Sequence, residues 1–269
     1  MIIDQYEQEL KETKKVIDSI KSFHYDSITL YGSAYNDKTF VNDLSDIDLI
    51  IMSKDFENMN LNKIIYELKS MGINFREKEP QIIIDSLCKR IELYIQYETI
   101  SIDLTLCGGL IPSKESLMKN AWYDSFEALM GGIYIHSKTL FGTIPDFELF
   151  KKEFNPFYNE EIRKARLKIV AEKLESYNKK IKYNYELKNN ETVDNLIKAR
   201  KFFMKLLFIF YKQYYWSPEK HIRYQLDSYL NLDNDTKDKI TLSKGDMFEC
   251  AKNYLEVSGS YLRRIKKEL

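Results

Sequence analysis

The sequence predicts an α+β protein in which a sheet-containing domain precedes an all-helical bundle. In the first half of the chain, short segments that alternate apolar and polar side chains are interspersed with amphipathic helical segments. Beyond residue 159 the apolar residues recur with helical spacing throughout. The 269 residues suffice for two domains of roughly 100–200 residues each. We expect domains of residues 1–148 and 149–269, joined by a connector that Pro145 and Pro156 flank.

Composition limits the class of protein and its partners. Lys+Arg and Asp+Glu both number 41, so no net charge draws the chain towards nucleic acid or a membrane surface. The three cysteines (Cys88, Cys107 and Cys250) are far apart, which indicates a reducing compartment without a disulfide framework. Charged residues from Asp4 onward argue against a signal peptide. The most apolar run, 202–211, is shorter than the roughly 20 residues that span a bilayer. We therefore expect a cytoplasmic protein that binds no membrane.

The first elements lead to a phosphate-binding turn. Residues 3–22 carry spaced apolar positions among many charges, as a surface helix does. Residues 27–31 form an apolar strand that runs into Gly32 and Ser33. Glycine allows the backbone to approach a ligand closely, and Ser33 can cap a following helix whose free N–H groups suit a phosphate. We expect Gly32 and Ser33 to bind the phosphates of a ligand.

A second strand begins with Asp46-Ile47-Asp48. Because side chains alternate along a strand, Asp46 and Asp48 share one face while Ile47 and Leu49 point into the core. Two neighbouring carboxylates repel each other unless a cation lies between them, and Mg²⁺ is the hard cation that suits oxygen ligands. A phosphate-binding turn beside a pair of carboxylates predicts nucleotide chemistry.

The next elements add a third carboxylate. Residues 60–70 are predicted to form a helix that ends at Gly72, and 73–85 an irregular or short-strand passage broken by Pro80. Residues 90–106 are predicted to form two alternating strands around a turn at Glu98-Thr99.

Paired as a hairpin, these two strands place Glu92, Tyr94 and Gln96 beside Asp103 on one face. Asp103 is therefore the third predicted metal ligand. The general base needs an ionised carboxylate within reach of the attacking hydroxyl. Both Asp103 and Glu92 remain candidates. Glu92 is also compatible with an ordinary polar residue on the solvent-exposed face of the strand.

The pattern Leu30-Tyr31-Gly32-Ser33, then Asp46-Ile47-Asp48-Leu49, then a carboxylate at Asp103 on a later strand resembles the DNA polymerase β-like nucleotidyltransferase superfamily. The resemblance implies a mixed sheet, a nucleoside triphosphate, and two Mg²⁺ ions held by Asp46, Asp48 and Asp103. Many relatives carry an arginine soon after Gly-Ser, near the triphosphate. Here the loop supplies Lys38, which either takes that phosphate-binding role or is a solvated loop lysine.

The rest of the chain is predicted to be mainly helical. Residues 113–130 read as a helix, and Gly131–His136 as a turn into a short strand in which the histidine is structural. In the bundle, the segment 192–214 is apolar nearly all round and is expected at the centre. The other predicted bundle helices are 159–188, one that starts at Trp216–Lys220, and 245–267. Aromatic residues between 211 and 224 either line an acceptor pocket or pack between helices; they are Tyr211, Tyr214, Tyr215, Trp216 and Tyr224.

A catalytic domain followed by such a bundle resembles the aminoglycoside adenylyltransferases, whose bundle forms one wall of the acceptor cleft. This resemblance implies transfer of AMP from ATP to a hydroxyl of a small molecule such as an antibiotic, with release of pyrophosphate, by a monomer or homodimer. Two alternatives stay open: nucleotidyl transfer to a protein or tRNA acceptor, and a non-catalytic, antitoxin-like nucleotide-binding module. Neither the acceptor nor the base of the nucleotide can be deduced from the carboxylate motif.

Overall fold

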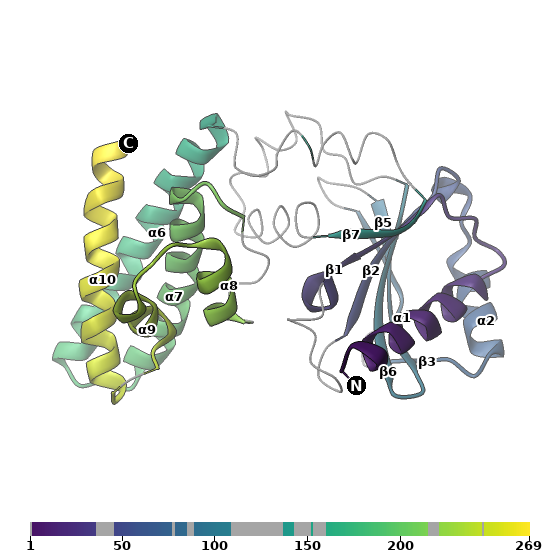
Figure 1. Cartoon of the computed structure of the whole chain (residues 1–269), viewed down its shortest axis with the longest axis horizontal. Coiled ribbons are helices and arrows are strands. Elements are labelled where there is room, and N and C mark those ends of the chain that lie inside the picture. The colour runs from purple at the N-terminus through teal and green to yellow at the C-terminus, as the bar shows by residue number, and fades with distance from the viewer. Residues whose placement is uncertain are drawn as a thin grey trace. The chain divides into compact units, whose positions relative to one another are not determined.

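The computed structural model describes residues 2–35, 46–76, 79–84, 89–108, 137–142, 152, 160–214, 221–243 and 245–269. These residues fall into two compact units, one from residue 2 to 108 with 137–142 and 152, and one from residue 160 onward (Figure 1). The predicted boundary between residues 148 and 149 lies outside the described residues, as do the predicted helix at 113–130 and the segment Gly131–His136.

The first unit contains a mixed sheet of seven strands within the described ranges (Figure 1). Its order is β3-β5-β6-β2-β1-β7, and β4 also pairs with β5. Only the β2–β6 pair is parallel among the described pairs. The strands are β1 (Ser27–Tyr31), β2 (Ile47–Met52), β3 (Asn74–Phe75), β4 (Gln81–Ile84), β5 (Lys89–Tyr97), β6 (Ile100–Cys107) and β7 (Lys138–Gly142). The predicted hairpin around Glu98-Thr99 is confirmed, and the passage 73–85 supplies the short strands β3 and β4.

Two helices, α1 (Ile2–Asp18) and α2 (Leu61–Ser70), pack their apolar side chains on the sheet. The side chain of Asn60 caps α2 by accepting a hydrogen bond from the backbone N–H of Lys63, at 3.2 Å. The helix ends where Gly72 adopts a left-handed φ of +77°. The core between these helices and the sheet includes Ile17, Ile20, Leu30, Ile47, Leu49, Ile64, Leu68, Leu93, Ile102 and Leu104. One face of the sheet is therefore committed to the core.

The second unit is helical in all its described elements: α6 (Glu160–Glu186), α7 (Glu191–Phe210), α8 (Ile222–Tyr229), α9 (Asn234–Thr241) and α10 (Met247–Glu268). Helix α10 packs against both α6 and α7. Residues 203–209 of α7 are all buried, which confirms the central position expected for this segment. The predicted helix start at Trp216–Lys220 lies outside the described residues. Helix α9 was not predicted.

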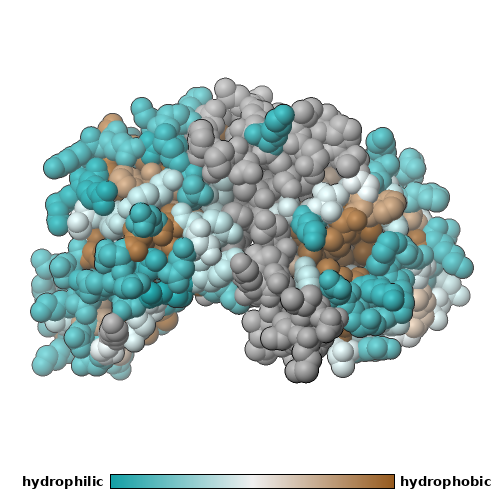
Figure 2. All heavy atoms as spheres, viewed as in Figure 1, coloured by the Kyte–Doolittle hydropathy of each residue, from teal (hydrophilic) through white to brown (hydrophobic). Residues whose placement is uncertain are grey.

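The α+β class is thus confirmed, with a mixed sheet followed by a helical unit. The described helices include none that is both long enough and apolar enough to cross a membrane. Figure 2 shows a mostly hydrophilic surface on the helical unit and a larger apolar patch on the sheet unit. Exposed large apolar side chains of the sheet unit are Tyr66, Met71, Ile82, Ile84, Leu140 and Phe141.

Candidate active site

A row of residues crosses the sheet on the face that α1 and α2 leave uncovered. The backbone N–H of Arg76, directly after β3, donates to the carbonyl of Tyr94 at 2.8 Å. The strand registers then place Tyr94 opposite Asp103, Asp103 opposite Asp48, and Asp48 opposite Tyr31. Cross-strand neighbours share a face of the sheet. Backbone hydrogen bonds therefore bring side chains from five segments of the chain into one line.

The predicted carboxylates lie within this row and beside it. Asp48 and Asp103 are partners in the parallel β2–β6 pair, where neighbouring backbones lie about 4.8 Å apart. Asp46 directly precedes β2, and its side chain is 35% exposed while that of Asp103 is 24% exposed. Ile47 and Leu49 are fully buried on the opposite face, as the alternation predicts. The structure therefore gathers the three aspartates at one end of the β2–β6 pair.

Arg76 is the residue of this region that the sequence interpretation missed. Its Nη1 donates to Oδ1 of Asp46 at 3.0 Å, and its Nη2 forms an ion pair with Oδ1 of Asp103. The guanidinium thus bridges two of the three predicted metal ligands. Its Nε is buried and has no hydrogen-bond partner within the described part of the chain. The arginine lies in the irregular passage 73–85, where no apolar period marks it.

Gly32 lies against the carboxylate of Asp48. It has a φ of +68°, a conformation that favours glycine, and it begins the short 3₁₀ turn Gly32–Tyr35 that follows β1. A Cβ added at this position would lie 2.1 Å from Oδ2 of Asp48. Only glycine lets the end of β1 approach the carboxylate so closely. Ser33 lies within the same turn, while its side chain and all of Lys38 lie outside the described residues.

Glu92, the second candidate base, lies on the same face, opposite Thr105. Its Oε1 accepts a hydrogen bond from Nε of Arg90 at 2.8 Å, and its Oε2 accepts one from the hydroxyl of Tyr94 at 2.6 Å. Burial raises the pKa of Glu92, but the hydrogen bonds from Tyr94 and Arg90 outweigh burial, so its pKa is lowered. Burial and the neighbouring Glu92 raise the pKa of Tyr94 to about 12. Both carboxylate oxygens of Glu92 are thus engaged.

The electrostatic character of the row is also visible at Tyr31. Burial, and then the negative charge of Asp48, raise the pKa of the Tyr31 hydroxyl. Because Tyr31 pairs with Asp48 across β1 and β2, the phenol stays neutral beside the carboxylate. Asp48 therefore lies between a tyrosine on β1 and a second carboxylate on β6.

The chemistry of the donors fits a hard divalent cation. Asp46, Asp48 and Asp103 offer carboxylate oxygens, the ligands that Mg²⁺ prefers, and two of the three are carried by paired strands. Within the described ranges, no group of three or more histidine, cysteine, aspartate or glutamate side chains is arranged to hold a metal ion. Two of the three aspartates contact the guanidinium of Arg76 instead. Their role as metal ligands stays a prediction.

The aromatic residues of the helical unit divide into two groups. Tyr214 is only 2% exposed, and the hydroxyl of Tyr211 lies 3.1 Å from that of Tyr261 on α10. These contacts indicate that Tyr211 and Tyr214 pack within the bundle, one of the two roles expected for them. Tyr224 is partly exposed on α8, and residues 215–216 lie outside the described residues.

Comparison with known proteins yields a structural likeness but no match in sequence. No protein-family profile matches the chain, and no curated protein matches it either. Among solved structures, the chain is similar to a nucleotidyltransferase-like protein from Exiguobacterium sibiricum 255-15, with 11% sequence identity and a TM-score of 0.43. The match covers 96% of this chain and 75% of that one.

Proposed function

We propose that this chain is a nucleotidyltransferase that moves AMP from ATP onto a hydroxyl of a small molecule, such as an aminoglycoside-like antibiotic, and releases pyrophosphate. The observation that carries the proposal is the in-register pairing of Asp48 with Asp103 on parallel strands, with Gly32 packed against Asp48. This pairing supports the proposal because it puts two of the three proposed metal ligands side by side on one face of the sheet. We place the enzyme in the cytoplasm as a monomer or homodimer.

Asp46, Asp48 and Asp103 are the residues that would hold Mg²⁺. Two bound ions would offset the charge of the triphosphate and lower the pKa of the acceptor hydroxyl. Gly32, Ser33 and Lys38 are proposed to bind the phosphates, the glycine because its missing side chain leaves the backbone accessible.

We assign the general base to Asp103 in preference to Glu92. Glu92 already accepts hydrogen bonds on both oxygens, whereas Asp103 accepts its bond from Arg76 on Oδ1, and its Oδ2 has no partner among the described residues. In the proposed step the acceptor hydroxyl gives its proton to Asp103 and its oxygen bonds to the α-phosphorus. The bond from that phosphorus to the bridging oxygen breaks, and pyrophosphate leaves with the electron pair.

A second candidate is a non-catalytic nucleotide-binding module. Arg76 supports it, because a guanidinium that already offsets part of the charge of Asp46 and Asp103 reduces the need for a metal ion at these carboxylates. Such a module would bind nucleotide without releasing pyrophosphate.

The deciding experiment measures pyrophosphate release from each of the four nucleoside triphosphates with Mg²⁺, against a panel of aminoglycosides and related hydroxylated compounds. Acceptor-dependent release from ATP that is lost in Asp48→Asn supports the proposed enzyme and identifies its acceptor. Nucleotide binding in a thermal-shift assay without release under any condition contradicts the proposed small-molecule transfer and favours the binding module.

A further inference from the structure

We propose that Arg76 is a built-in cation that competes with divalent metal ions for Asp46 and Asp103, so that metal binding requires the guanidinium to leave these carboxylates. This inference rests on the proposed function, because it takes Asp46, Asp48 and Asp103 as the metal ligands. Arg76 is not part of the carboxylate motif. We assign its guanidinium two positions: one at the carboxylates when no metal ion is bound, and one away from them when a metal ion is bound.

The backbone of Arg76 is fixed by the sheet. Asn74 and Phe75 pair with Gln96 and Ile95, and the N–H of Arg76 continues this pairing by donating to Tyr94. Tyr94 in turn lies opposite Asp103, so one strand separates the arginine from the aspartate. The long side chain crosses that strand to reach both carboxylates. Its anchorage on a strand means that the guanidinium can change position while its backbone stays in place.

The contacts of the guanidinium are only partly satisfied. Each Nη atom is directed at a different aspartate, while the buried Nε has no partner among the described residues. A buried donor without a hydrogen bond costs free energy. The three charged side chains are also partly exposed, at 25% for Arg76, 35% for Asp46 and 24% for Asp103. Water can therefore replace these contacts, which favours an exchangeable pair over a permanent one.

Arginine and metal ion would compete for the same two carboxylates. The Oδ1 atoms that Arg76 contacts belong to two proposed ligands, and two cations held at one pair of carboxylates repel each other. Removing the charge of Arg76 should therefore tighten metal binding. A purely structural role predicts the opposite, since loss of a supporting residue loosens a ligand set.

The test is calorimetric titration of the full chain with Mn²⁺ for wild type, Arg76→Gln, Asp48→Asn and the control Lys89→Gln. Lys89 also carries a positive charge on the sheet unit but pairs with Glu57 at the surface. We expect Arg76→Gln to bind Mn²⁺ about fivefold more tightly than wild type, the size of change that loss of a partly exposed ion pair allows. Lys89→Gln should bind as wild type does, and Asp48→Asn should bind far more weakly.

Stability gives a readout that is independent of turnover. Without metal, Arg76→Gln should unfold at a lower temperature than wild type, because its aspartates then lack their counter-charge. Mn²⁺ should raise the Tm of Arg76→Gln more than it raises that of wild type. In wild type, the NMR signal of the Arg76 Nε–H should move and exchange faster with solvent when Mg²⁺ is added. Because this last measurement uses the wild-type protein, it tests whether the guanidinium leaves the carboxylates even if the variant does not fold.

The experiments distinguish failure of the proposed competition from failure of the proposed function. Mn²⁺ binding that depends on Asp48 but is equal or weaker in Arg76→Gln overturns the competition and leaves the proposed function standing. An Arg76 Nε–H signal that is unchanged at saturating Mg²⁺ also overturns the competition and leaves the proposed function standing. Absence of any Mn²⁺ binding that depends on Asp48, in wild type and variant alike, overturns both the competition and the proposed metal site.

Discussion

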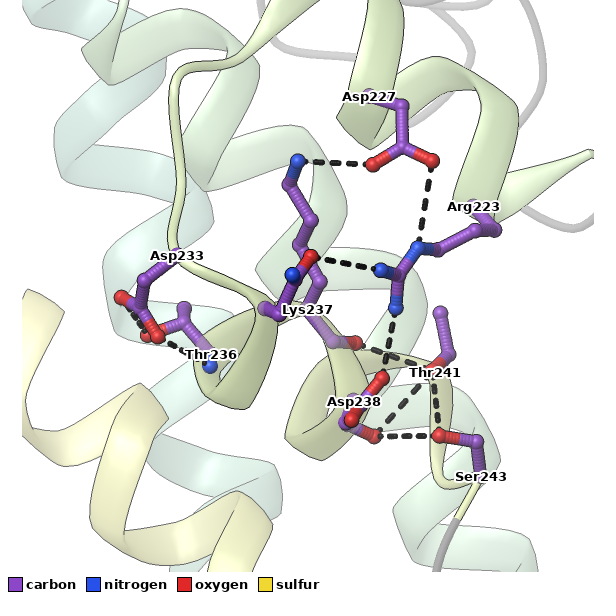
Figure 3. Close-up of polar contacts among 9 residues, drawn as sticks. Arg223, Asp227, Asp233, Thr236, Lys237, Asp238, Thr241 and Ser243 are labelled. Atoms are coloured by element: carbon purple, nitrogen blue, oxygen red, sulfur yellow. Dashed lines mark hydrogen bonds and ion pairs between the residues drawn. The ribbon is translucent and has the colours of Figure 1, made fainter.

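The charged clusters of the two units are built differently. In the helical unit, Arg223 on α8 pairs with Asp227 and Asp238, and Lys237 on α9 also pairs with Asp227, with contacts of 2.7 to 3.3 Å (Figure 3). Among the described residues this cluster thus joins two cations to two anions. On the sheet, one guanidinium, that of Arg76, serves both Asp46 and Asp103.

The two clusters differ in whether their positive and negative charges balance. The balanced cluster joins α8 to α9, and its charges neutralise each other, so it has no need of a further ion. Among the described residues, the sheet cluster sets one guanidinium against the carboxylates of Asp46 and Asp103, and this excess of negative charge favours an added cation. Four predictions test or sharpen this contrast, from the largest effect to the smallest.

The largest effect is expected from Asp48→Asn on the sheet and its counterpart Asp227→Asn in the bundle. If the proposed function is correct, Asp48→Asn lowers turnover on the order of a thousandfold, since a charge that acts on the reacting groups is lost. The Tm should stay close to that of wild type. Asp227→Asn should leave turnover unchanged and lower the Tm slightly, because its exposed ion pairs are weak. Pyrophosphate release and thermal unfolding measure both, and equal turnover in the two variants would remove the contrast.

Gly32→Ala and Gly72→Ala form a second matched pair. Both glycines have a positive φ, +68° and +77°, so alanine should cost each variant about 1 kcal/mol of unfolding free energy. At Gly32 the new Cβ meets Oδ2 of Asp48, whereas at Gly72 no atom lies within 4 Å. We therefore expect turnover to fall about a hundredfold in Gly32→Ala only. Similar turnover in both variants would show that the approach of β1 to Asp48 has no functional role.

Arg163→Gln tests a cluster within the bundle by its dependence on pH. The side chain of Arg163 is 3% exposed and pairs with Glu160 and Glu268, while Lys212 also contacts Glu160, at 3.2 Å. Hydrogen bonds from Arg163, and to a lesser degree from Lys212, lower the pKa of Glu160 from its ordinary 4.5 to about 2. A carboxyl group whose pKa is lower in the folded than in the unfolded chain stabilises the fold at pH values above its pKa in the unfolded chain. This stabilisation is lost as the pH falls through its pKa in the folded chain.

We therefore expect the variant to lose about 1 kcal/mol at neutral pH, a modest figure because the half-exposed Glu160 is screened by water. The difference from wild type should shrink between pH 4.5 and pH 2, the interval between the ordinary and the lowered pKa. Urea unfolding at several pH values measures it. A difference that stays constant over this interval would mean that the ion pair is not its source.

The smallest effect is expected for Arg223→Gln in the cluster of Figure 3. The side chain of Arg223 is 43% exposed, so its ion pairs with Asp227 and Asp238 are weak and screened by salt. A slight loss of Tm at low salt should disappear at high salt, while turnover stays unchanged. A large loss that persists at high salt would show that this surface cluster supports the fold by packing rather than by charge.

Local patterns in the sequence predict the elements of the site well. The alternation of Asp46, Ile47 and Asp48, and that of Ile102, Asp103 and Leu104, correctly separates polar from buried positions. Each pattern depends on the period of a single strand. The hairpin of β5 and β6 also follows from sequence, because a short turn connects its two strands.

What the sequence does not predict is pairing between distant segments. Arg76 follows a two-residue strand that has no period of its own, and nothing nearby in the chain indicates that β3 pairs with β5. The short helix α9 was missed for a related reason. Of its eight residues only Ile240 is buried, so it shows no apolar stripe to detect.

The parallel pairing of β2 with β6 has a consequence for how the protein folds. Between these strands the chain forms α2, β3, β4 and β5, so Asp48 and Asp103 meet only after a long loop has closed. Contacts between distant segments form slowly, because closing the loop costs entropy before any contact repays it. A newly synthesised chain would thus form its local hairpin early and its paired aspartates late, and a partly folded molecule would lack the proposed site for divalent ions.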